Sequence, residues 1–313
     1  MGTLRYGFSG VDIWFHLDIA EQYAAGNLAG GFDVGFAVDK TFYPPLFHFL
    51  LVPGYWLGAS EFYALVFQVL FLPVAVGSFV FLVFRLRGVT SAFYGGLLLL
   101  GSMAFLDRVI QAQPHALDLV LLSWVFYFCL FRKGKGFVVA SVLMVWNHGV
   151  VAVSALGGVL LAQLRWRRWR LFAGWLIGAF PVIAVSLLFL VSGLRSYGAA
   201  VDTDQEYLFW HSITFVPEYL GLLTAGFVVG GFVVYKFLRG QVVSAASKLA
   251  VLTVLSAAVM VPMWADRWLQ YSTIPLALLI LEQAHLSGPK VQLMLKAAIV
   301  VSVAYTFGEL LLF

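Results

Sequence analysis

The hydrophobic residues of this chain fall into long runs that short polar segments separate. A helix that crosses a membrane takes roughly 20 consecutive apolar residues, and most of these runs approach that length. The runs predict helices at 61–84, 91–106, 114–131, 137–147, 149–164, 171–192, 217–236, 248–264, 268–286 and 291–313. We therefore expect an all-α, polytopic membrane bundle of about ten transmembrane helices.

Two of these runs are short, and they meet at the polar break 146–149, with the sequence Trp-Asn-His-Gly. Non-helical backbone at membrane depth is tolerated only where it is buried in protein or lines a cavity. The sequence thus predicts that His148 lies at a helix break inside the membrane domain.

The N-terminal region has a different pattern, because residues 11–25 predict a short amphipathic helix. One face of this helix is apolar and a second carries Asp18 and Glu21. A third face holds Asp12 and His16, although a surface helix needs only one polar face. Two explanations fit the position of Asp12 equally well: it caps the helix, or it has a functional role.

Residues 43–58 contain three prolines and a glycine in a largely apolar segment. They predict a juxtamembrane or re-entrant helix that returns to its own side of the membrane. The chain then divides into an outer first loop, 1–60, and a transmembrane domain, 61–313, with an outer loop at 194–217.

Composition narrows the class of protein. The chain is 62% hydrophobic and 11% charged, whereas soluble domains carry about 25% charged residues. This excludes an ordinary soluble domain. The single cysteine, Cys129, excludes an internal disulfide.

The distribution of charge sets the expected orientation. If residues 1–60 lie outside, 14 of the 19 Lys and Arg residues lie on the inner side and five on the outer side, as the positive-inside rule requires. Fourteen of the 15 acidic residues then lie on the outer side, and Glu282 is the exception. We expect a multi-pass plasma-membrane protein with its active site facing outside. The basic run 165–170 is interpreted as a cytoplasmic anchor, and no nucleic-acid partner is expected.

Polar clusters stand at the predicted outer ends of the helices. His115 and Asp118 are three residues apart on one helix and share a face; they suit a metal pair or a His–Asp hydrogen bond. Asp118 lies a turn into the membrane, where an ionisable group is by default functional. Asp266 and Arg267 form an acid–base pair that suits either an interfacial salt bridge or substrate binding.

The outer loop carries a second metal-type signal, because Asp202 and Asp204 have DxD spacing. In some transferases this spacing holds a divalent ion with a nucleotide-sugar. A solvated acidic loop explains the same residues.

Several short motifs, taken in order, resemble the GT-C class of integral membrane glycosyltransferases. They are Gly10-Val-Asp12-Ile-Trp-Phe-His16-Leu, then Tyr43-Pro44-Pro45-Leu46, then Arg108 ahead of His115-Ala-Leu-Asp118, and Asp266-Arg267 with Tyr271 and Pro275. The resemblance implies an inverting transferase with a polyprenyl- or dolichyl-phosphate-linked sugar donor. It also implies that Asp12 is the catalytic carboxylate. Members of the class differ in metal dependence.

The sequence departs from the class in three respects. About nine residues precede Gly10, where class members have a membrane span, so we expect either an omitted span or a reduced version. The acceptor motif WWDYG of oligosaccharyltransferases is absent from the sequence, which argues against peptide N-glycosylation. Asp12 is followed by Ile13, so the paired acids of protein O-mannosyltransferases are not matched.

We therefore expect a sugar transfer from a polyprenyl-phosphate carrier to a lipid, glycan or protein acceptor, with Asp12 as general base. The candidate residues are catalytic Asp12, His16 and Asp118, and substrate-binding Tyr43, Arg108, His115, His148, Asp266 and Arg267. Mg²⁺ or Mn²⁺ is a candidate cofactor, with its ligands unassigned. The alternatives are a transporter or flippase of lipid-linked substrates and a non-catalytic accessory subunit that keeps the fold.

Overall fold

The apolar runs are helices in the computed structural model, which describes residues 12–28, 44–110, 113–166, 168–197, 220–260 and 265–312. The helices are α1 (Asp12–Ala24), α2 (Leu46–Trp56), α3 (Ser60–Arg87), α4 (Val89–Leu100), α5 (Met103–Val109), α6 (Pro114–Leu130), α7 (Gly134–Arg165), α8 (Trp169–Tyr197), α11 (Ala225–Leu238), α12 (Ala245–Ala257), α13 (Ala265–Leu286) and α14 (Pro289–Leu312), with the short 3₁₀ helices η3 (Gly221–Thr224) and η4 (Ala258–Met260). The described residues contain no strand, so the predicted all-α class is confirmed.

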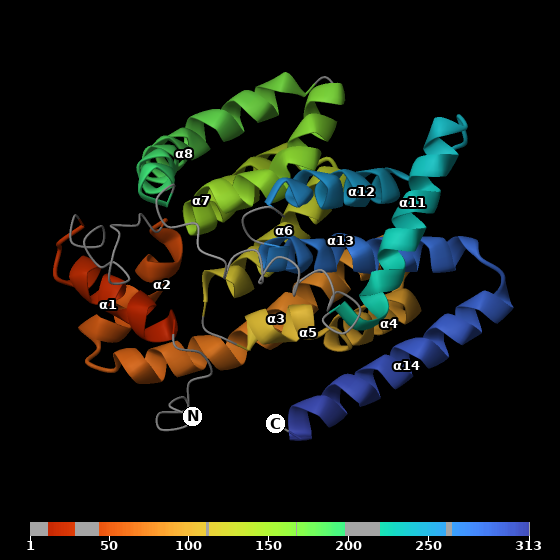
Figure 1. Cartoon of the computed structure of the whole chain (residues 1–313), viewed down its shortest axis with the longest axis horizontal. Helices are drawn as coiled ribbons and strands as arrows, with labels where there is room; N and C mark the ends of the chain where they lie inside the picture. Colours follow the sequence, from red (N-terminus) through yellow and green to blue (C-terminus); the bar gives the residue numbers. More distant parts are fainter. Residues whose placement is uncertain are drawn as a thin grey trace.

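The long helices lie side by side and form a bundle, with α1 and α2 against one end (Figure 1). Helix α13 occupies its interior, since all its residues from Leu269 to Glu282 are buried. Four segments among the described residues are long and apolar enough to cross a membrane: Ser60–Arg87, Trp169–Leu187, Gly221–Leu238 and Pro289–Gly308. Shorter apolar helices, including α4, α6 and α12, pack among them. The chain is a helical membrane protein.

Helix α7 reverses direction in the middle. Gly149 has φ +57° and ψ −133°, which are not helical angles. The segment before it runs along α8, because Gly134 lies against Leu171 while Gly149 lies against Ser186. After Gly149 the chain returns, and α7 ends at Arg165 just before α8 begins. The helix break predicted at 146–149 is therefore confirmed.

Another predicted helix is divided. The run 91–106 forms α4 and α5, which are separated at Gly101 and Ser102. The carbonyl of Gly101 accepts a hydrogen bond from the Ser302 hydroxyl of α14 (3.1 Å). It also lies 2.7 Å from where a Cβ on Gly221 would be. Close packing of three segments at one backbone position explains an interruption that hydrophobicity alone does not predict.

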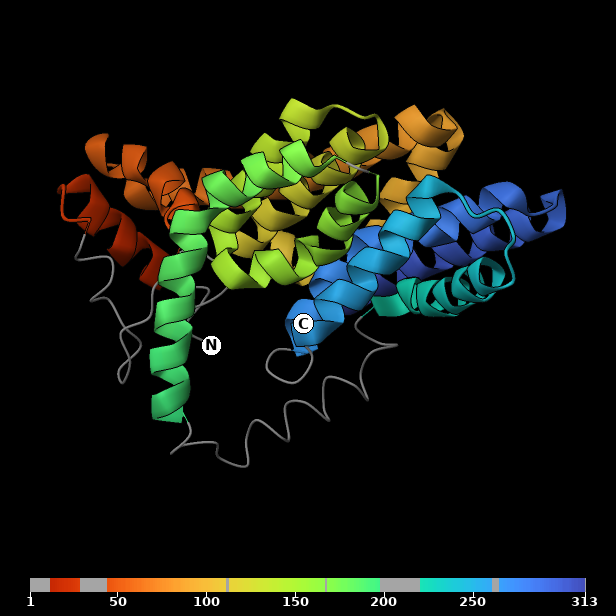
Figure 2. The same ribbon diagram turned by 90° about the horizontal axis from the view of Figure 1, so that it is seen from above.

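Helix α8 bends along its length (Figure 2). It contains Pro181, and proline kinks helices.

The two polar faces of α1 have different environments. Asp18 and Glu21 are exposed, as predicted for a solvated face. His16, Ile19 and Tyr23 are buried against α2. The second polar face is thus an interface with the helix that follows it.

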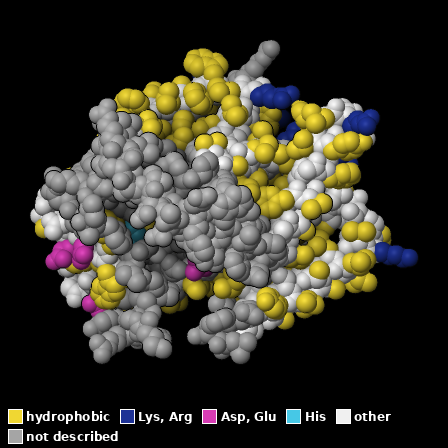
Figure 3. Space-filling model, in the orientation of Figure 1, with side chains coloured by type: hydrophobic (Ala, Val, Ile, Leu, Met, Phe, Trp, Pro, Cys, Tyr) yellow, Lys and Arg dark blue, Asp and Glu magenta, His cyan; other side chains and the backbone are white. Residues whose placement is uncertain are grey.

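Charged side chains separate along the long axis of the bundle. On the face drawn in Figure 3, acidic side chains lie toward α1 and α2, and basic side chains lie toward the opposite end. Helix α3 has 28 residues and connects the two ends, a distance of about 42 Å. We call these two ends the α1–α2 end and the Arg87 end.

Candidate active site

The α1–α2 end of the bundle contains a buried carboxylate, that of Asp118, with no exposed surface. Its Oδ1 accepts a hydrogen bond from the Asn147 amide (2.7 Å). Its Oδ2 lies 2.6 Å from Nδ1 of His148 and accepts a hydrogen bond from the Tyr271 hydroxyl. The Tyr271 hydroxyl is also 3.0 Å from Nδ1 of His148. These four residues form one polar network, which we call the Asp118 network.

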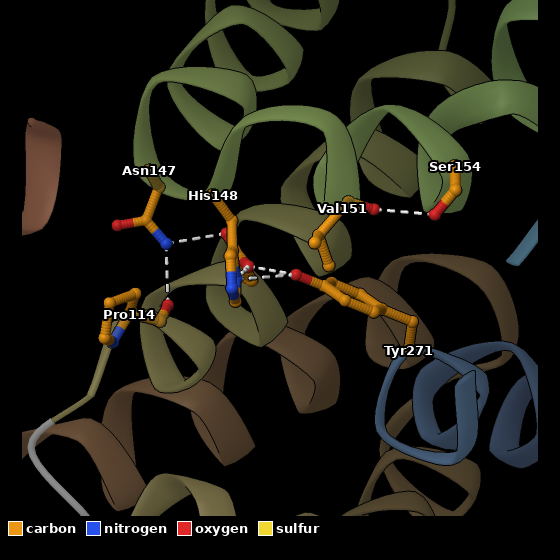
Figure 4. Close-up of polar contacts among 7 residues, drawn as sticks. Pro114, Asn147, His148, Val151, Ser154 and Tyr271 are labelled. Carbon is orange, nitrogen blue, oxygen red and sulfur yellow. Dashed lines mark hydrogen bonds and ion pairs between the residues drawn. The ribbon is translucent and has the colours of Figure 1, made fainter. Parts of the chain in front are cut away.

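Local sequence explains how α6 and α7 contribute to this network. Pro114 begins α6, a position that suits its fixed φ. The non-helical angles of Gly149 end the first half of α7 directly after His148. The Asn147 amide also donates to the carbonyl of Pro114 (2.6 Å), which fixes the α7 bend against the start of α6 (Figure 4).

Tyr271 lies far from the other members of the network in the sequence. It lies in the first half of α13, 1% exposed, and its ring points toward His148 in Figure 4. Three helices, α6, α7 and α13, therefore supply the network. Because each side chain is fixed by at least one partner on another helix, the network is preorganised.

His115 extends the network. Its ring lies beside that of His148, with centroids 4.1 Å apart and an interplanar angle of 42°. One potential ligand atom from each of His115, Asp118 and His148 lies within 4.8 Å of the other two. The His115–Asp118 pair predicted from the sequence is thus joined by His148, and the set can hold a metal ion by its chemistry.

A second pair of histidines connects α1 with α2. Nδ1 of His16 lies 3.0 Å from Nε2 of His48, and Nδ1 of His48 lies 3.2 Å from the carbonyl of Pro44. A carbonyl only accepts hydrogen bonds, so Nδ1 of His48 carries the proton. Burial lowers the pKa of His48 to about 3, and the neutral ring then accepts through Nε2. Nδ1 of His16 is accordingly the donor in this pair.

The histidine pair and the Asp118 network meet at one backbone contact. Pro44, whose carbonyl accepts from His48, packs against Gly149, the residue after His148. A Cβ on Gly149 would lie 3.1 Å from Cγ of Pro44 and 2.6 Å from the Ser186 hydroxyl, and its φ is +57°. Only glycine fits both the space and the backbone angle here. The α1–α2 pair is therefore held directly against the α7 bend.

The predicted site residues divide into three groups. His115, Asp118 and His148 come together, and His16 lies in the adjoining histidine pair. Asp12 begins α1, Arg108 lies in α5, and Asp266 and Arg267 lie at the start of α13; their side chains are outside the described residues. Tyr43 and the loop residues Asp202 and Asp204 also lie outside them.

The candidate list omitted three residues that belong to these clusters: Asn147, Tyr271 and His48. Asn147 stands in the polar break at 146–149, and Tyr271 stands in a motif already compared with GT-C enzymes. The sequence therefore contained signals that could have added Asn147 and Tyr271 to the candidate list. Nothing in the sequence pairs His48 with His16.

The chemistry of the site follows from its groups. A buried carboxylate with imidazole, phenol and amide partners can hold or move a proton, orient a hydroxyl or bind a cation. No lysine or arginine among the described side chains contacts Asp118. In the described part of the site, therefore, no permanent positive charge neutralises the Asp118 carboxylate.

Solved membrane-protein structures share this arrangement of helices. In particular, the chain is similar to two crystal structures of ArnT from Cupriavidus metallidurans. The apo structure gives a TM-score of 0.57 at 16% identity, and the structure bound to undecaprenyl phosphate gives 0.55 at 17% identity. The matched region covers 92% of this chain in both comparisons.

This likeness establishes the shared fold, as the sequence motifs predicted. The chain spans 57% and 58% of the two ArnT chains, somewhat less than two thirds of their length. The sequence matches no protein-family model and no curated protein.

Proposed function

We propose that this chain is a membrane glycosyltransferase that transfers a sugar from a polyprenyl-phosphate carrier to an acceptor. The observation that carries the proposal is the position of the Asp118 network within a fold shared with ArnT over 92% of this chain. One of the similar structures is ArnT bound to undecaprenyl phosphate. We therefore propose undecaprenyl phosphate or a close relative as the carrier.

The charge pattern supports an active site on the extracytoplasmic face of the plasma membrane. Acidic residues gather toward the α1–α2 end and basic residues toward the Arg87 end on the face drawn in Figure 3. The positive-inside rule assigns the basic end to the cytoplasm. A donor with its prenyl chain in the bilayer can then present its phosphate beside α1 and the α7 bend.

We assign the general base to Asp12, which begins the helix that carries His16. A base must lie within hydrogen-bond reach of the acceptor hydroxyl as the anomeric carbon is attacked. In this scheme the Asp118 network orients the reacting groups, with His115 and His148 beside it. Arg108 and Arg267 bind the phosphate, while Tyr43 and Asp266 complete the substrate contacts.

The proposal is tested by measuring transfer of radiolabelled sugar from undecaprenyl-phosphate-linked donors by the purified protein. We compare the wild type with Asp12→Asn and with Asp18→Asn, the latter an exposed carboxylate of the same helix. Loss of general-base catalysis reduces rates by about 10²- to 10⁴-fold. We expect a fall in this range for Asp12→Asn and no more than about a twofold change for Asp18→Asn.

Equal activity of Asp12→Asn and the wild type would refute the assignment of the base. Absence of transfer with every donor, in protein that unfolds cooperatively on heating, would refute the enzyme itself. In that case movement of labelled lipid across proteoliposomes would distinguish a flippase from an accessory subunit.

A further inference from the structure

We propose that His115, Asp118 and His148 bind a divalent transition-metal ion of the Zn²⁺ type. The three side chains come from α6 and from the bend of α7. His115 and Asp118 are buried and His148 is partly buried. We call them the His-Asp-His cluster.

The first argument is charge. The other strongly buried carboxylate of the described chain, Glu282, is bound by Arg87 through two hydrogen bonds of 2.7 Å. Asp118 instead contacts only Asn147, His148 and Tyr271 among the described side chains. A buried carboxylate is stabilised by a positive partner, and among the described residues only a protonated His148, at 2.6 Å, offers one to Asp118. A bound cation would supply the positive charge that Arg87 supplies to Glu282.

The second argument is the kind of ligand. Two imidazoles and one carboxylate form a ligand set typical of Zn²⁺, Co²⁺ and related ions. Mg²⁺ prefers oxygen ligands and keeps several of its waters, so it suits this set less well. The sequence-based expectation of Mg²⁺ or Mn²⁺ assigned no ligands, and the two imidazoles of the cluster favour a softer ion.

The third argument is distance. Ligands at about 2.1 Å from one ion lie at most about 4.2 Å apart, and the three atoms here lie within 4.8 Å of one another. Around a tetrahedral ion the ligand atoms lie about 3.4 Å apart, so the side chains shift by about an ångström on binding. The 2.6 Å contact between His148 and Asp118 is a hydrogen-bond distance, so it widens when both atoms bind the ion.

The surrounding residues already orient these ligands. Asn147 fixes Asp118 through Oδ1 and is itself bound to the Pro114 carbonyl. Tyr271 donates to the other carboxylate oxygen. Partners of this kind typically change metal affinity by 10- to 100-fold.

The metal site is inferred from this geometry alone. Its role in the reaction rests on the proposed function. An ion at the α1–α2 end would place positive charge where we propose that the donor phosphate lies. Such charge stabilises a departing phosphate oxygen.

The test is titration of Co²⁺ into the full-length, tag-free protein, purified in detergent and stripped with chelator. We expect a visible absorption band with one Co²⁺ per chain, which Zn²⁺ abolishes in competition. Asp118→Asn and His115→Gln should each weaken Co²⁺ binding by more than about 100-fold, and Asn147→Ala by about 10- to 100-fold. His285→Ala, at an exposed histidine near the end of α13, is the matched control and should leave binding unchanged.

The absence of a stoichiometric band in the folded wild type would overturn the proposal, and so would equal binding by His115→Gln and the wild type. Thermal unfolding of each variant identifies proteins that have lost their fold. His115→Gln retains a polar side chain of similar length for this reason. Co²⁺ binding requires neither donor nor acceptor, so its failure is distinguishable from a failure of sugar transfer.

Discussion

Two carboxylates are buried at opposite ends of the same bundle, and their partners differ. Glu282, 1% exposed, accepts both hydrogen bonds of the Arg87 fork and a third from the Ser244 hydroxyl (2.7 Å). Asp118 has no exposed surface, and its partners are an amide, an imidazole and a phenol. Helix α13 contributes to both clusters, through Glu282 and Tyr271.

Under the proposed function, the difference separates a structural carboxylate, Glu282, from a functional one, Asp118. Arg87 carries a permanent charge, and its planar fork matches a carboxylate. Ser244 also caps α12 through Ser247 (3.1 Å), so the Glu282 cluster ties together α3, α12 and α13. Of the partners of Asp118, the imidazole and the phenol can instead give up or share a proton, whereas the amide only donates a hydrogen bond. A carboxylate in that setting remains available for a ligand, a proton or a cation.

The largest expected effect on stability is at the Arg87 end. Arg87→Met leaves the buried Glu282 carboxylate without its cation, which typically costs about 3–5 kcal/mol. We expect a large fall in the thermal unfolding midpoint in detergent. The double variant Arg87→Met/Glu282→Leu removes both charges and should recover most of that loss.

Asp118→Asn provides the matched measurement at the other end. The substitution keeps the shape of the side chain and its bond to Asn147 or Tyr271, so we expect a loss of about 1 kcal/mol. If Asp118→Asn destabilised the protein as much as Arg87→Met, the distinction between the two carboxylates would be wrong.

A smaller effect, on pH dependence, comes from the histidine pair beside the Asp118 network. Burial lowers the pKa of His48 to about 3, whereas an exposed histidine titrates near 6.5. The unfolded chain therefore binds a proton below pH 6.5 that the folded chain does not. Above pH 6.5 His48 therefore does not lower the free energy of unfolding. As the pH falls from 6.5 toward 3, His48 lowers the free energy of unfolding by up to about 1.4 kcal/mol per pH unit.

His48→Gln removes this titration, so its unfolding midpoint should fall less steeply between pH 7 and pH 4.5 than that of the wild type. His285→Ala, at an exposed site, serves as the control and should keep the wild-type slope. Parallel curves for His48→Gln and the wild type would contradict the burial of a neutral His48.

The sequence predicted those parts of the fold that depend on local pattern. The apolar runs predicted the helices, and the polar residues before Gly149 predicted the break in α7. The division of 91–106 into α4 and α5 was not predicted, because it depends on contacts of Gly101 with Gly221 and Ser302, more than a hundred residues away.

The candidate site was predicted in part for the same physical reason. His115 and Asp118 share a helix face, so spacing alone pairs them. The contacts of Asp118 with His148 and Tyr271 span 30 and 153 residues. Hydrophobic pattern places such residues at helix ends but cannot show which ends meet. The pairing of His16 with His48 depends likewise on how α1 packs on α2.

The central claim is that the α1–α2 end performs sugar transfer, and the most direct test compares turnover at the two ends. Labelled sugar transfer from undecaprenyl-phosphate donors would be measured for Asp118→Asn and for Arg87→Met/Glu282→Leu, each at a temperature where it is folded. We predict a fall of at least about 100-fold for Asp118→Asn and turnover within a few-fold of wild type for the double variant. Equal turnover in both variants, or none in the wild type, would contradict the claim.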